Sequence, residues 1–487
     1  MKQEINFDEI TNFCKRKGFV FPSGDLYGSF AGFCDFGNLG VELKNNIKSS
    51  WWNFYVRQRE DIIGLDGAII TNPKVWEASG HVDCFLDYAV ECKKCSHKFK
   101  VDKAELKTAK CEKCGGEIIN KGEFNPMFIT EVGPIKEDSI KSYLRPETAQ
   151  LIFANFKNIL DTNRLKLPFG VAQIGKSFRN EIAPRNFLFR LREFEQMEIE
   201  YFINPKEKRR CPYEIQDLEV LVYSAEMQEK KKEPEKMKLT EALKKGIIKL
   251  SWHAYWLSNS LNWFKENGAN LDNFRIRQHE KNELAHYSSD CWDIEYKFPF
   301  GYKELQGIAD RGTYDLTSHQ NKSSKSLELL EEETKEKILP MVICEPSFGV
   351  ERAFLVYLLE AYSKNDKGEV ILKLHPKISP IKVAIFPLVK KDEELVKKAR
   401  EIYYDLRKEF NCIYDEKGSV GRRYARNDEI GTPYCIVTDT QTLEDNTATI
   451  RNRNDGKQIR INIEKIKDTI RKLINQEMNF EESGILV

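Results

Sequence analysis

The chain has 487 residues, of which 31% are charged, and its 77 lysines and arginines almost cancel its 76 aspartates and glutamates. This length suggests about three domains with a large core, and the neutral total means that any basic surface for nucleic acid must be local. No segment approaches the roughly 18 consecutive apolar residues of a membrane span, and the N-terminus has no apolar signal core. The 12 cysteines are scattered apart from one cluster. We therefore expect a cytoplasmic enzyme rather than a membrane protein or a small disulfide-linked scaffold.

The first part of the chain predicts helix, loop and strand in turn. Residues 5–17 predict a short helix, and the glycine- and aromatic-rich stretch 18–40 predicts loop with short strand. Residues 42–61 predict a long helix with apolar side chains on one side, and residues 67–76 predict a β-rich segment that Pro73 ends. An ordinary helix–strand pair is sufficient to explain this order of elements.

Two CxxC pairs form the cysteine cluster, with 15 residues between them. This spacing matches a zinc ribbon, because each pair turns tightly enough to aim both sulfurs at one tetrahedral ion, and Gly115 and Gly116 relieve the second turn. A closed site of four thiolates leaves no open position, so the zinc is expected to be structural. The alternatives are two disulfides, which a reducing compartment disfavours, or four unbound thiols; His97 is expected to be exposed. The predicted ligands are Cys92, Cys95, Cys111 and Cys114.

Secondary structure is predicted for five segments between this cluster and residue 316. Residues 128–132 predict a strand, residues 142–156 begin extended and become helical, and residues 298–316 predict strand. Residues 251–267 predict an aromatic amphipathic helix that packs in the core. The highly charged residues 204–250 predict exposed helices or loop, either an insertion that could meet an RNA backbone or a solvated surface.

Residues 178–202 predict two strands joined by a loop at residues 184–186. Because side chains alternate along a strand, Arg179 and Glu181 are expected to share one face of the first strand. On the returning strand one face carries Arg190, Arg192, Phe194, Gln196 and Glu198, and the other carries Leu191, Met197 and Ile199. Cations, a ring and then carboxylates follow in the order that an adenine nucleotide and an amine require. A solvated hairpin with salt bridges is the alternative.

Residues 341–362 predict an apolar strand, a break at Pro-Ser-Phe-Gly and a buried helix. Arg352 falls in the first turn of this helix, where free backbone N–H groups and the helix dipole favour anions. Gly349 lets the chain approach a ligand closely.

The last part of the chain predicts a separate small domain. Residues 375–380 form a linker, and strands then alternate with a charged helix at 391–410, which indicates an α/β domain. Five arginines supply local positive charge for RNA. They are Arg422, Arg423, Arg426, Arg451 and Arg453.

The segments 178–202, 42–73 and 341–362 resemble motifs 2, 1 and 3 of the class II aminoacyl-tRNA synthetases, in the version of the glycyl-tRNA synthetase family. The resemblance covers nearly all of the chain. It implies an α+β fold, with an antiparallel sheet flanked by helices in a catalytic core at 1–375. A zinc-ribbon insertion at 88–122 and the charged insertion at 204–250 would interrupt this core, and residues 380–487 would form an α/β anticodon-binding domain. Motif 1 would build the interface of a homodimer.

The resemblance also implies a reaction, in which ATP and Mg²⁺ are used to join glycine to tRNA(Gly) through a glycyl-adenylate. The alternatives are another class II synthetase, of the prolyl or threonyl type, and a non-catalytic tRNA-binding paralogue. Some relatives have a substrate-contacting arginine where Lys100 stands here, so that role is not transferred.

Residue roles follow from the same resemblance. Arg179, Glu181 and Arg352 would be catalytic, Glu304 would contact Mg²⁺, and Glu304 with Arg311 resembles an element that faces the metal and ATP. The ATP contacts would be Arg179, Asn180, Glu181, Phe189, Arg190, Leu191, Arg192, Glu193, Phe194, Glu304, Leu305, Gly349 and Arg352. The glycine contacts would be Glu147, Phe194, Glu195, Gln196, Met197, Glu198, Glu345, Ser347 and Gly349.

Overall fold

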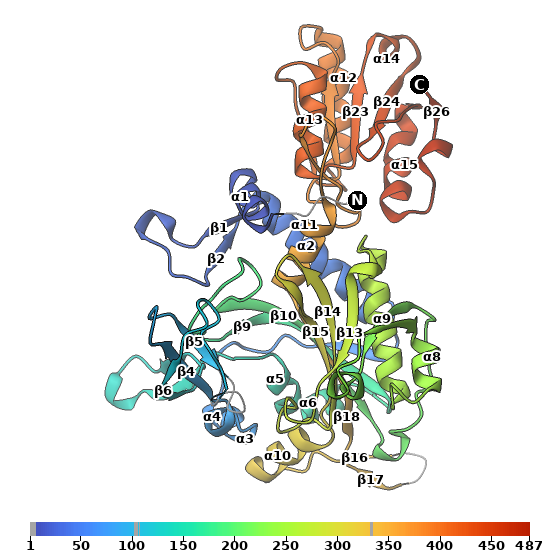
Figure 1. The fold of residues 1–487 in the computed structure, drawn as a ribbon. Coiled ribbons are helices and arrows are strands. Elements are labelled where there is room, and N and C mark those ends of the chain that lie inside the picture. Colours follow the sequence, from blue (N-terminus) through green and yellow to red (C-terminus); the bar gives the residue numbers. More distant parts are fainter. Residues whose placement is uncertain (1–5, 102–105, 107, 332–334) are drawn as a thin grey trace.

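The structure, a computed structural model, describes residues 6–101, 106, 108–331 and 335–487. A large body is built on a nine-stranded sheet, and a smaller C-terminal body lies above it (Figure 1). The sheet has the order β12-β11-β13-β14-β15-β18-β10-β9-β3, and its neighbours are antiparallel except for β11–β13 and β3–β9. The predicted α+β fold with an antiparallel core sheet is therefore confirmed. The strands are β3 (Ile62–Gly64), β9 (Phe169–Phe178), β10 (Glu193–Ile203), β11 (Glu219–Tyr223), β12 (Glu235–Lys238), β13 (Phe274–Gln278), β14 (Asp290–Phe298), β15 (Gly301–Asp310) and β18 (Met341–Gly349).

Helices cover both faces of this sheet. On one face, helices α2 (Asn38–Trp52), α9 (Ser251–Glu266) and α11 (Val350–Ala361) pack through a core rich in aromatic rings, including Trp51, Trp263 and Phe348. On the other face, α5 (Ala149–Ala154), α6 (Phe156–Thr162) and α10 (Tyr314–Ser323) bury Phe202 and Val342. Burying each large apolar side chain contributes about 1.5–3 kcal/mol, so this layered core holds β10 and β18 firmly in register.

A β-bulge in β18 changes which of its side chains face α5 and α10. Phe202 pairs with Val342, but the neighbouring Tyr201 pairs with Cys344, so β18 carries one extra residue at this point. Because a bulge shifts the alternation by one residue, Glu345 lies on the same face as Val342 although their positions differ by three, an odd number that would put them on opposite faces of a regular strand.

Two predicted segments have a different structure. The strand expected at 67–76 is absent from the described chain; β3 lies earlier, Ile70 forms only an isolated bridge, and Pro73 begins helix α3 (Pro73–Ala78), a position that proline favours. The expectation of exposed helix or loop throughout 204–250 is wrong for β11 and β12. Their alternating apolar side chains, with Val220 and Met237 buried, extend the core sheet at its edge.

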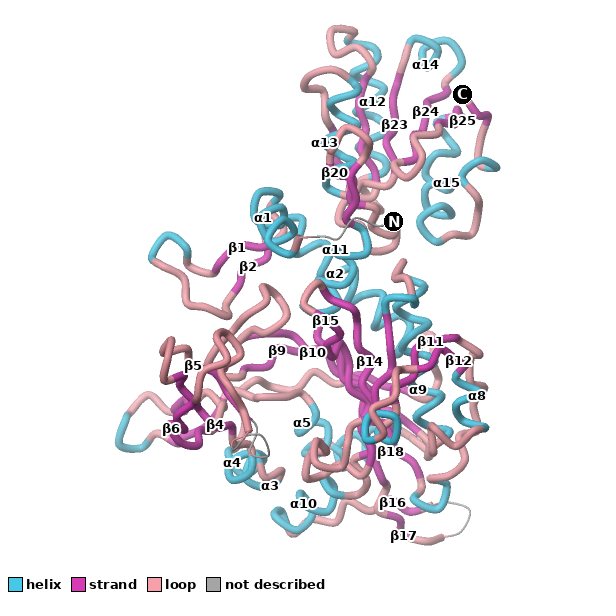
Figure 2. Tube along the Cα trace, viewed as in Figure 1, coloured by secondary structure: helices cyan, strands magenta, loops and turns pink. Residues whose placement is uncertain are grey.

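The cysteine cluster lies in a three-stranded sheet of order β5-β4-β6, beside the large body (Figure 2). Its strands are β4 (Asp87–Cys92), β5 (Lys98–Val101) and β6 (Ile118–Phe124). The other elements of the large body that the argument uses are α1 (Phe7–Lys17), β1 (Val20–Pro22), β2 (Cys34–Phe36), α4 (His81–Cys84), β7 (Ile129–Val132) and β8 (Ile140–Tyr143).

The C-terminal body is a six-stranded sheet of order β22-β21-β23-β24-β25-β26, packed against helices. Its strands are β21 (Val383–Pro387), β22 (Cys412–Tyr414), β23 (Tyr434–Thr438), β24 (Thr447–Asn452), β25 (Gln458–Asn462) and β26 (Ile485–Leu486). Its helices are α12 (Glu393–Leu406), α13 (Val420–Ile430), α14 (Thr440–Asp445) and α15 (Ile463–Asn475). Among the described residues, no helix is both long and apolar enough to cross a membrane.

Candidate active site

The candidate site lies on the second face of the sheet, over β9, β10, β18 and β15. The strand register places Gln196 next to Gly349 and Glu198 next to Ser347. Ser177 Oγ donates to Gln196 Oε1 at 2.7 Å, and Gln196 Nε2 donates to Ser347 Oγ at 3.3 Å. These hydrogen bonds fix the middle of the site, between an arginine-rich end and a carboxylate-rich end.

At the arginine-rich end, two guanidinium groups lie over aromatic rings, Arg179 over Phe194 and Arg352 over Phe189. Arg179 follows β9, and its guanidinium carbon lies 5.5 Å from the centroid of the Phe194 ring. Arg352 lies in the first turn of α11, where its Nη1 donates to the carbonyl oxygen of Glu304 at 2.9 Å and pairs with Glu304 Oε2 at 3.2 Å. A guanidinium has five donors, more than these contacts use. This end therefore suits the phosphates and base of a nucleotide.

The loop between β9 and β10 (residues 179–192, the motif 2 loop) is longer than predicted. Asn186 and Phe187 have positive φ angles, so the chain turns there and β10 begins only at Glu193. Arg190 and Arg192 therefore precede the strand, and Glu181 follows β9 instead of extending it. Arg192 holds the loop by donating to the carbonyl oxygens of Glu181 (2.9 Å) and Ala31 (3.0 Å).

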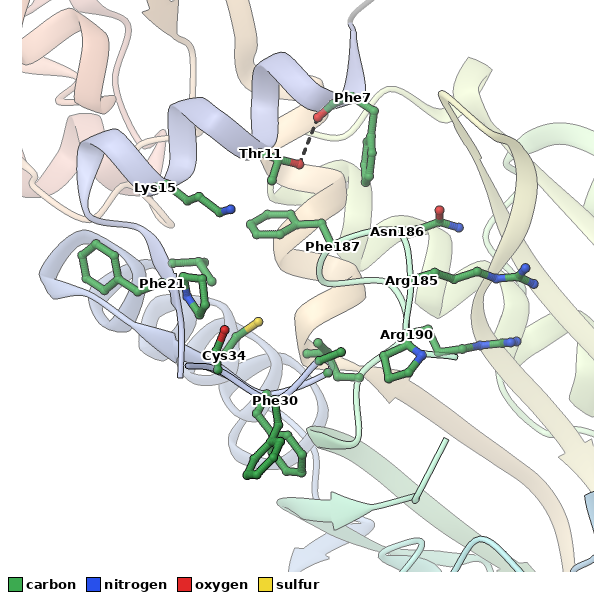
Figure 3. A pocket seen from close by; sticks show the side chains of 18 of the residues that line it. Phe7, Thr11, Lys15, Phe21, Phe30, Cys34, Arg185, Asn186, Phe187 and Arg190 are labelled. Carbon is green, nitrogen blue, oxygen red and sulfur yellow. Dashed lines mark hydrogen bonds between the residues drawn. The ribbon is translucent and has the colours of Figure 1, made fainter. Parts of the chain in front are cut away.

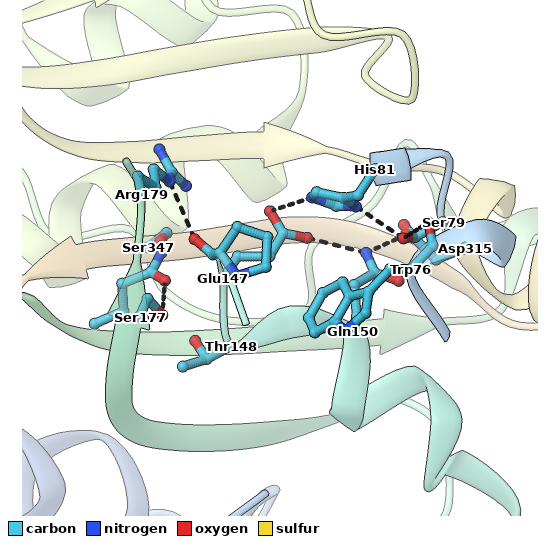
Figure 4. Close-up of polar contacts among 12 residues, drawn as sticks. Trp76, Ser79, His81, Glu147, Thr148, Gln150, Ser177, Arg179, Asp315 and Ser347 are labelled. Atoms are coloured by element: carbon cyan, nitrogen blue, oxygen red, sulfur yellow. Dashed lines mark hydrogen bonds and ion pairs between the residues drawn. The ribbon is translucent and has the colours of Figure 1, made fainter. Parts of the chain in front are cut away.

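At the opposite end of the site, Arg311 joins buried carboxylates. Its Nε and Nη2 donate to Asp315 at 2.7 and 2.9 Å, and its Nη1 donates to Glu345 Oε1 at 2.6 Å. Glu147 pairs with His81 Nε2 at 3.4 Å and accepts a hydrogen bond from Gln150 Nε2 at 3.0 Å (Figure 4). The structure thus brings Glu147 and Glu345 together around one cation.

Glu198 lies beside these groups, and the charges of the pocket are unequally balanced. Its carboxylate accepts a hydrogen bond from Thr148 Oγ1. Burial, and then the neighbouring Glu147, raise the pKa of Glu198, and burial raises the pKa of Glu345 well above its usual value despite Arg311. Burial acts in the same direction on Glu147, but His81 and Arg311 outweigh it and hold that pKa well below the usual range. A pocket with this excess of carboxyl groups favours a positively charged ligand.

The resemblance places Arg311, with Glu304, in an element that faces the metal and ATP, and the structure buries its side chain fully among the carboxylates. The sequence analysis did not identify several residues of this pocket. The four-residue spacing of Arg311 and Asp315 was a visible signal, because such pairs meet on a helical turn. Glu200 shares the alternation of Glu198 and could have been found in the same way. The missed residues are His81, Gln150, Glu200 and Asp315.

Several predicted contact residues turn their side chains away from this face. Glu195 pairs with Lys48 at 3.0 Å, and its backbone N–H donates to Glu351, on the side of α2 and α11. Glu193 pairs with Lys176 at the rim, and Asn180 is exposed. Leu191, Met197 and Leu305 are buried in the apolar core. Apart from the rim residues Glu193 and Asn180, these positions can contact a ligand on this face only through their backbone.

The predicted break in residues 346–349 is also wrong, because β18 continues to Gly349 and α11 begins at once. Arg352 nevertheless lies in the first helical turn, as predicted.

The four clustered cysteines have the geometry of a metal site. Their sulfur atoms all lie within 4.8 Å of one another, with Cys92–Cys114 at 3.4 Å and Cys95–Cys111 at 3.6 Å. Tetrahedral zinc with thiolate bonds of about 2.3 Å separates sulfurs by about 3.8 Å, whereas a disulfide requires about 2.05 Å. At Gly116 a Cβ would lie 3.1 Å from Cys92 Sγ, so glycine leaves room for this arrangement. The sulfurs therefore fit a structural zinc ion.

The same ribbon contacts the motif 2 loop, since Arg185 forms an ion pair with Glu112 between the second pair of cysteines. Lys100, on β5, lies 3.9 Å from Glu181 Oε1 and 3.1 Å from Asp87 Oδ2. On the other side of the loop lies an open cavity of about 450 Å³, lined by α1, β1, β2 and loop residues (Figure 3). The loop is thus held between the ribbon and the N-terminal segment.

Only part of the predicted arginine surface in the C-terminal body exists. Arg423 and Arg453 are buried and donate to backbone carbonyls, such as those of Gly418 and Leu374. Arg451 pairs with Asp428, and Arg426 pairs with Asp415. Arg422 is exposed.

Known protein families match both bodies. Residues 130–362 match the family described as tRNA synthetase class II core domain (G, H, P, S and T), and residues 382–473 match the anticodon binding domain. The chain is 43% identical over 488 residues to a glycine–tRNA ligase of Borrelia garinii, covering 98% of this chain and 100% of the relative. A glycine–tRNA ligase of Clostridium kluyveri is 43% identical over 506 residues (97% and 100%), and one of Treponema denticola is 41% identical over 470 residues (94% and 95%). The chain therefore belongs to the glycine–tRNA ligase family, within the class II aminoacyl-tRNA synthetases.

Proposed function

We propose that the chain attaches glycine to tRNA(Gly) in two steps. Glycine and ATP give glycyl-adenylate and pyrophosphate, and the glycyl group then passes to a hydroxyl of the terminal adenosine of the tRNA, releasing AMP. One observation carries this proposal: a buried carboxylate pocket that suits an ammonium group lies on the same strands as an arginine and phenylalanine surface that suits ATP.

The first step requires no nucleophile from the protein, because the glycine carboxylate attacks the α-phosphate. Arg179 holds this phosphate, Arg352 neutralises the outer phosphates, and Phe194 stacks on adenine, while Glu181 and Arg190 assist the nucleotide. Catalysis then depends on alignment and on stabilising the charge that develops at phosphorus. Mg²⁺ supplies further neutralisation of the phosphates when bound, and the Glu304 carboxylate offers the oxygen ligand that this ion prefers.

Glycine selection depends on charge and size. Glycine has no side chain to grip, so Glu147, Glu198 and Glu345 surround its ammonium, and Ser347 narrows the space beside the α-carbon. A pocket excludes an amino acid with a larger side chain by steric contact more easily than it detects an amino acid that lacks a group. These roles support glycine over proline or threonine as the substrate.

The remaining assignments concern the partners. The boundaries 1–375 and 380–487 are proposed for the catalytic core and the anticodon-binding domain, with insertions at 88–122 and 204–250. Lys15 and Arg190 line the cavity beside the motif 2 loop, where the acceptor end of tRNA would approach the adenylate. We further infer a cytoplasmic homodimer that uses the motif 1 segment, with one structural zinc ion in each chain.

ATP–pyrophosphate exchange with purified protein tests the function directly. Glycine should support exchange, and alanine, serine, proline and threonine should support it barely. Exchange with proline or threonine in place of glycine would assign another class II activity. No exchange with any amino acid, despite tRNA binding, would indicate a non-catalytic paralogue.

A further inference from the structure

Glu200 is a buried carboxyl group to which the proposed reaction gives no role. It follows Glu198 by two residues on β10, so both side chains point to the same face. Glu200 is 0% exposed, and neither carboxylate oxygen has a hydrogen-bond partner in the part of the chain that the structure describes. An ionised carboxylate in such a place is costly. A proton or a cation must therefore compensate it.

Three carboxyl groups converge at this point. Oxygen atoms of Glu198, Glu200 and Glu345 lie within 4.8 Å of one another. The strands are antiparallel, so the register that pairs Glu198 with Ser347 places Glu200, two residues later in β10, opposite Glu345, two residues earlier in β18. Like charges directly opposite each other in a sheet repel, and two carboxylates this close do not both ionise easily.

The surrounding elements neutralise this trio of carboxyl groups only in part. Arg311, directly after β15, pairs with Glu345 of the trio and with Asp315 of α10, but in the described part of the chain it forms no hydrogen bond with Glu200. Glu147, before α5, adds another carboxylate and is paired with His81 of α4. Burial, and next the repulsion from Glu345, raise the pKa of Glu200 well above its usual value.

On the basis of the function proposed above, we propose that Glu200 is a positioning residue of the glycine pocket. It holds a proton while the pocket is empty and releases it when the ammonium group of glycine enters. The balance is one proton for each glycine bound. The protonated Glu200 and zwitterionic glycine give a Glu200 carboxylate beside the bound ammonium, and the proton passes to solvent.

This exchange makes glycine binding depend on pH. Below the raised pKa of Glu200, the affinity should increase about tenfold for each pH unit, and above it the affinity should become constant. Glutamine at this position imitates the protonated side chain. Glu200→Gln should therefore bind glycine roughly tenfold more weakly at pH 8 and lose this pH dependence. It should also raise the unfolding midpoint of the ligand-free protein at pH 8, because Glu200 must take up a proton on folding at this pH and glutamine need not, whereas loss of a purely structural contact would lower it.

Isothermal titration calorimetry of glycine into the full chain with bound α,β-methylene-ATP tests the exchange. Titrations from pH 6 to 8.5, in three buffers of different ionisation enthalpy, give the number of protons released. The wild type should release about one proton at the acidic end of this range, and Glu200→Gln should release none. Asp61→Asn is the matched control, because Asp61 contacts Tyr201 on the other face of β10; its proton release should equal that of the wild type.

Each contrary result has a distinct meaning. Glycine binding without proton release, or equal release by Glu200→Gln, overturns the role of Glu200 and leaves the proposed function intact. Release of a metal ion on glycine binding, detected by elemental analysis, would show that a cation occupies the trio and would also overturn the role. If the wild type neither binds nor activates glycine, the proposed function fails, and this role fails with it.

Discussion

Replacing Glu198 with glutamine tests the glycine pocket directly, because it removes one charge with almost no change of shape. Glu198 is buried, accepts a hydrogen bond from Thr148 and lies next to Ser347. Removing one partner of a buried charge pair costs about 2–4 kcal/mol. Because Glu147 and Glu345 share the ammonium, and because burial raises the pKa of Glu198, we expect the lower limit. This is about 2 kcal/mol, or roughly a 30-fold loss of glycine affinity.

Exchange assays at varied glycine and ATP concentrations separate the two ends of the site. The KM for glycine should rise roughly 30-fold, and the KM for ATP should stay constant because Arg179 and Arg352 are unchanged. Asp61→Asn controls for a loss of stability near β10, since Asp61 accepts from Tyr201 on the opposite face of that strand. An unchanged KM for glycine in Glu198→Gln, or an equal rise in Asp61→Asn, would refute the reasoning.

Other consequences can be measured separately. Metal analysis should find about one zinc per chain. Cys114→Ser should lower the zinc content and weaken ATP–pyrophosphate exchange, because it loosens the ribbon that contacts the motif 2 loop. Full activity of a reduced, zinc-free preparation would contradict this. Arg423→Ala should lower the free energy of unfolding by about 2–4 kcal/mol because buried carbonyls lose their donor. Arg422→Ala should instead weaken tRNA charging, with a shallower salt dependence, and similar unfolding curves for the two variants would argue against this division. Burial lowers the pKa of His375 from 6.5 to about 4. The contribution of neutral His375 to the free energy of unfolding is therefore complete above pH 6.5 and is lost as the pH falls towards 4, by about 3 kcal/mol at most. Chemical denaturation between pH 4 and 7.5 should therefore show a flatter dependence for His375→Gln, and an unchanged slope would exclude His375 as the cause.

Local patterns in the sequence were sufficient to predict several features of the site. The alternation of Phe194, Gln196 and Glu198 correctly gave the face of β10 that they share, and the first helical turn after Gly349 correctly gave the position of Arg352. The spacing of the two cysteine pairs predicted sulfurs that converge. Each of these signals depends on the periodicity of one element or on one tight turn, so neighbouring residues carry all the information.

The high charge of 204–250 concealed a pattern of the same kind. Its average composition favours solvent, but β11 needs only a few alternating apolar residues, such as Val220 and Val222, to complete the edge of a sheet. In the motif 2 loop the error is the opposite one, because the sequence pattern predicts strand where the structure has a loop. Arg190 and Arg192 continue the alternation in the sequence, although a turn with positive φ angles at Asn186 and Phe187 delays the start of β10.

The sequence by itself therefore determined the shared face of β10, the position of Arg352 and the convergence of the four cysteines, because these follow from short-range geometry. Only the tertiary structure decided which charges are used for binding and which are used for stability. Arg311 joins carboxylates from α10, β18 and the segment before α5, and Arg423 is enclosed by its own domain. Glu200 and Glu345 face each other because the register of β10 and β18 pairs them, although they are far apart in the sequence. Burial and pairing between distant segments set the charge state of a side chain, and no local pattern contains that information.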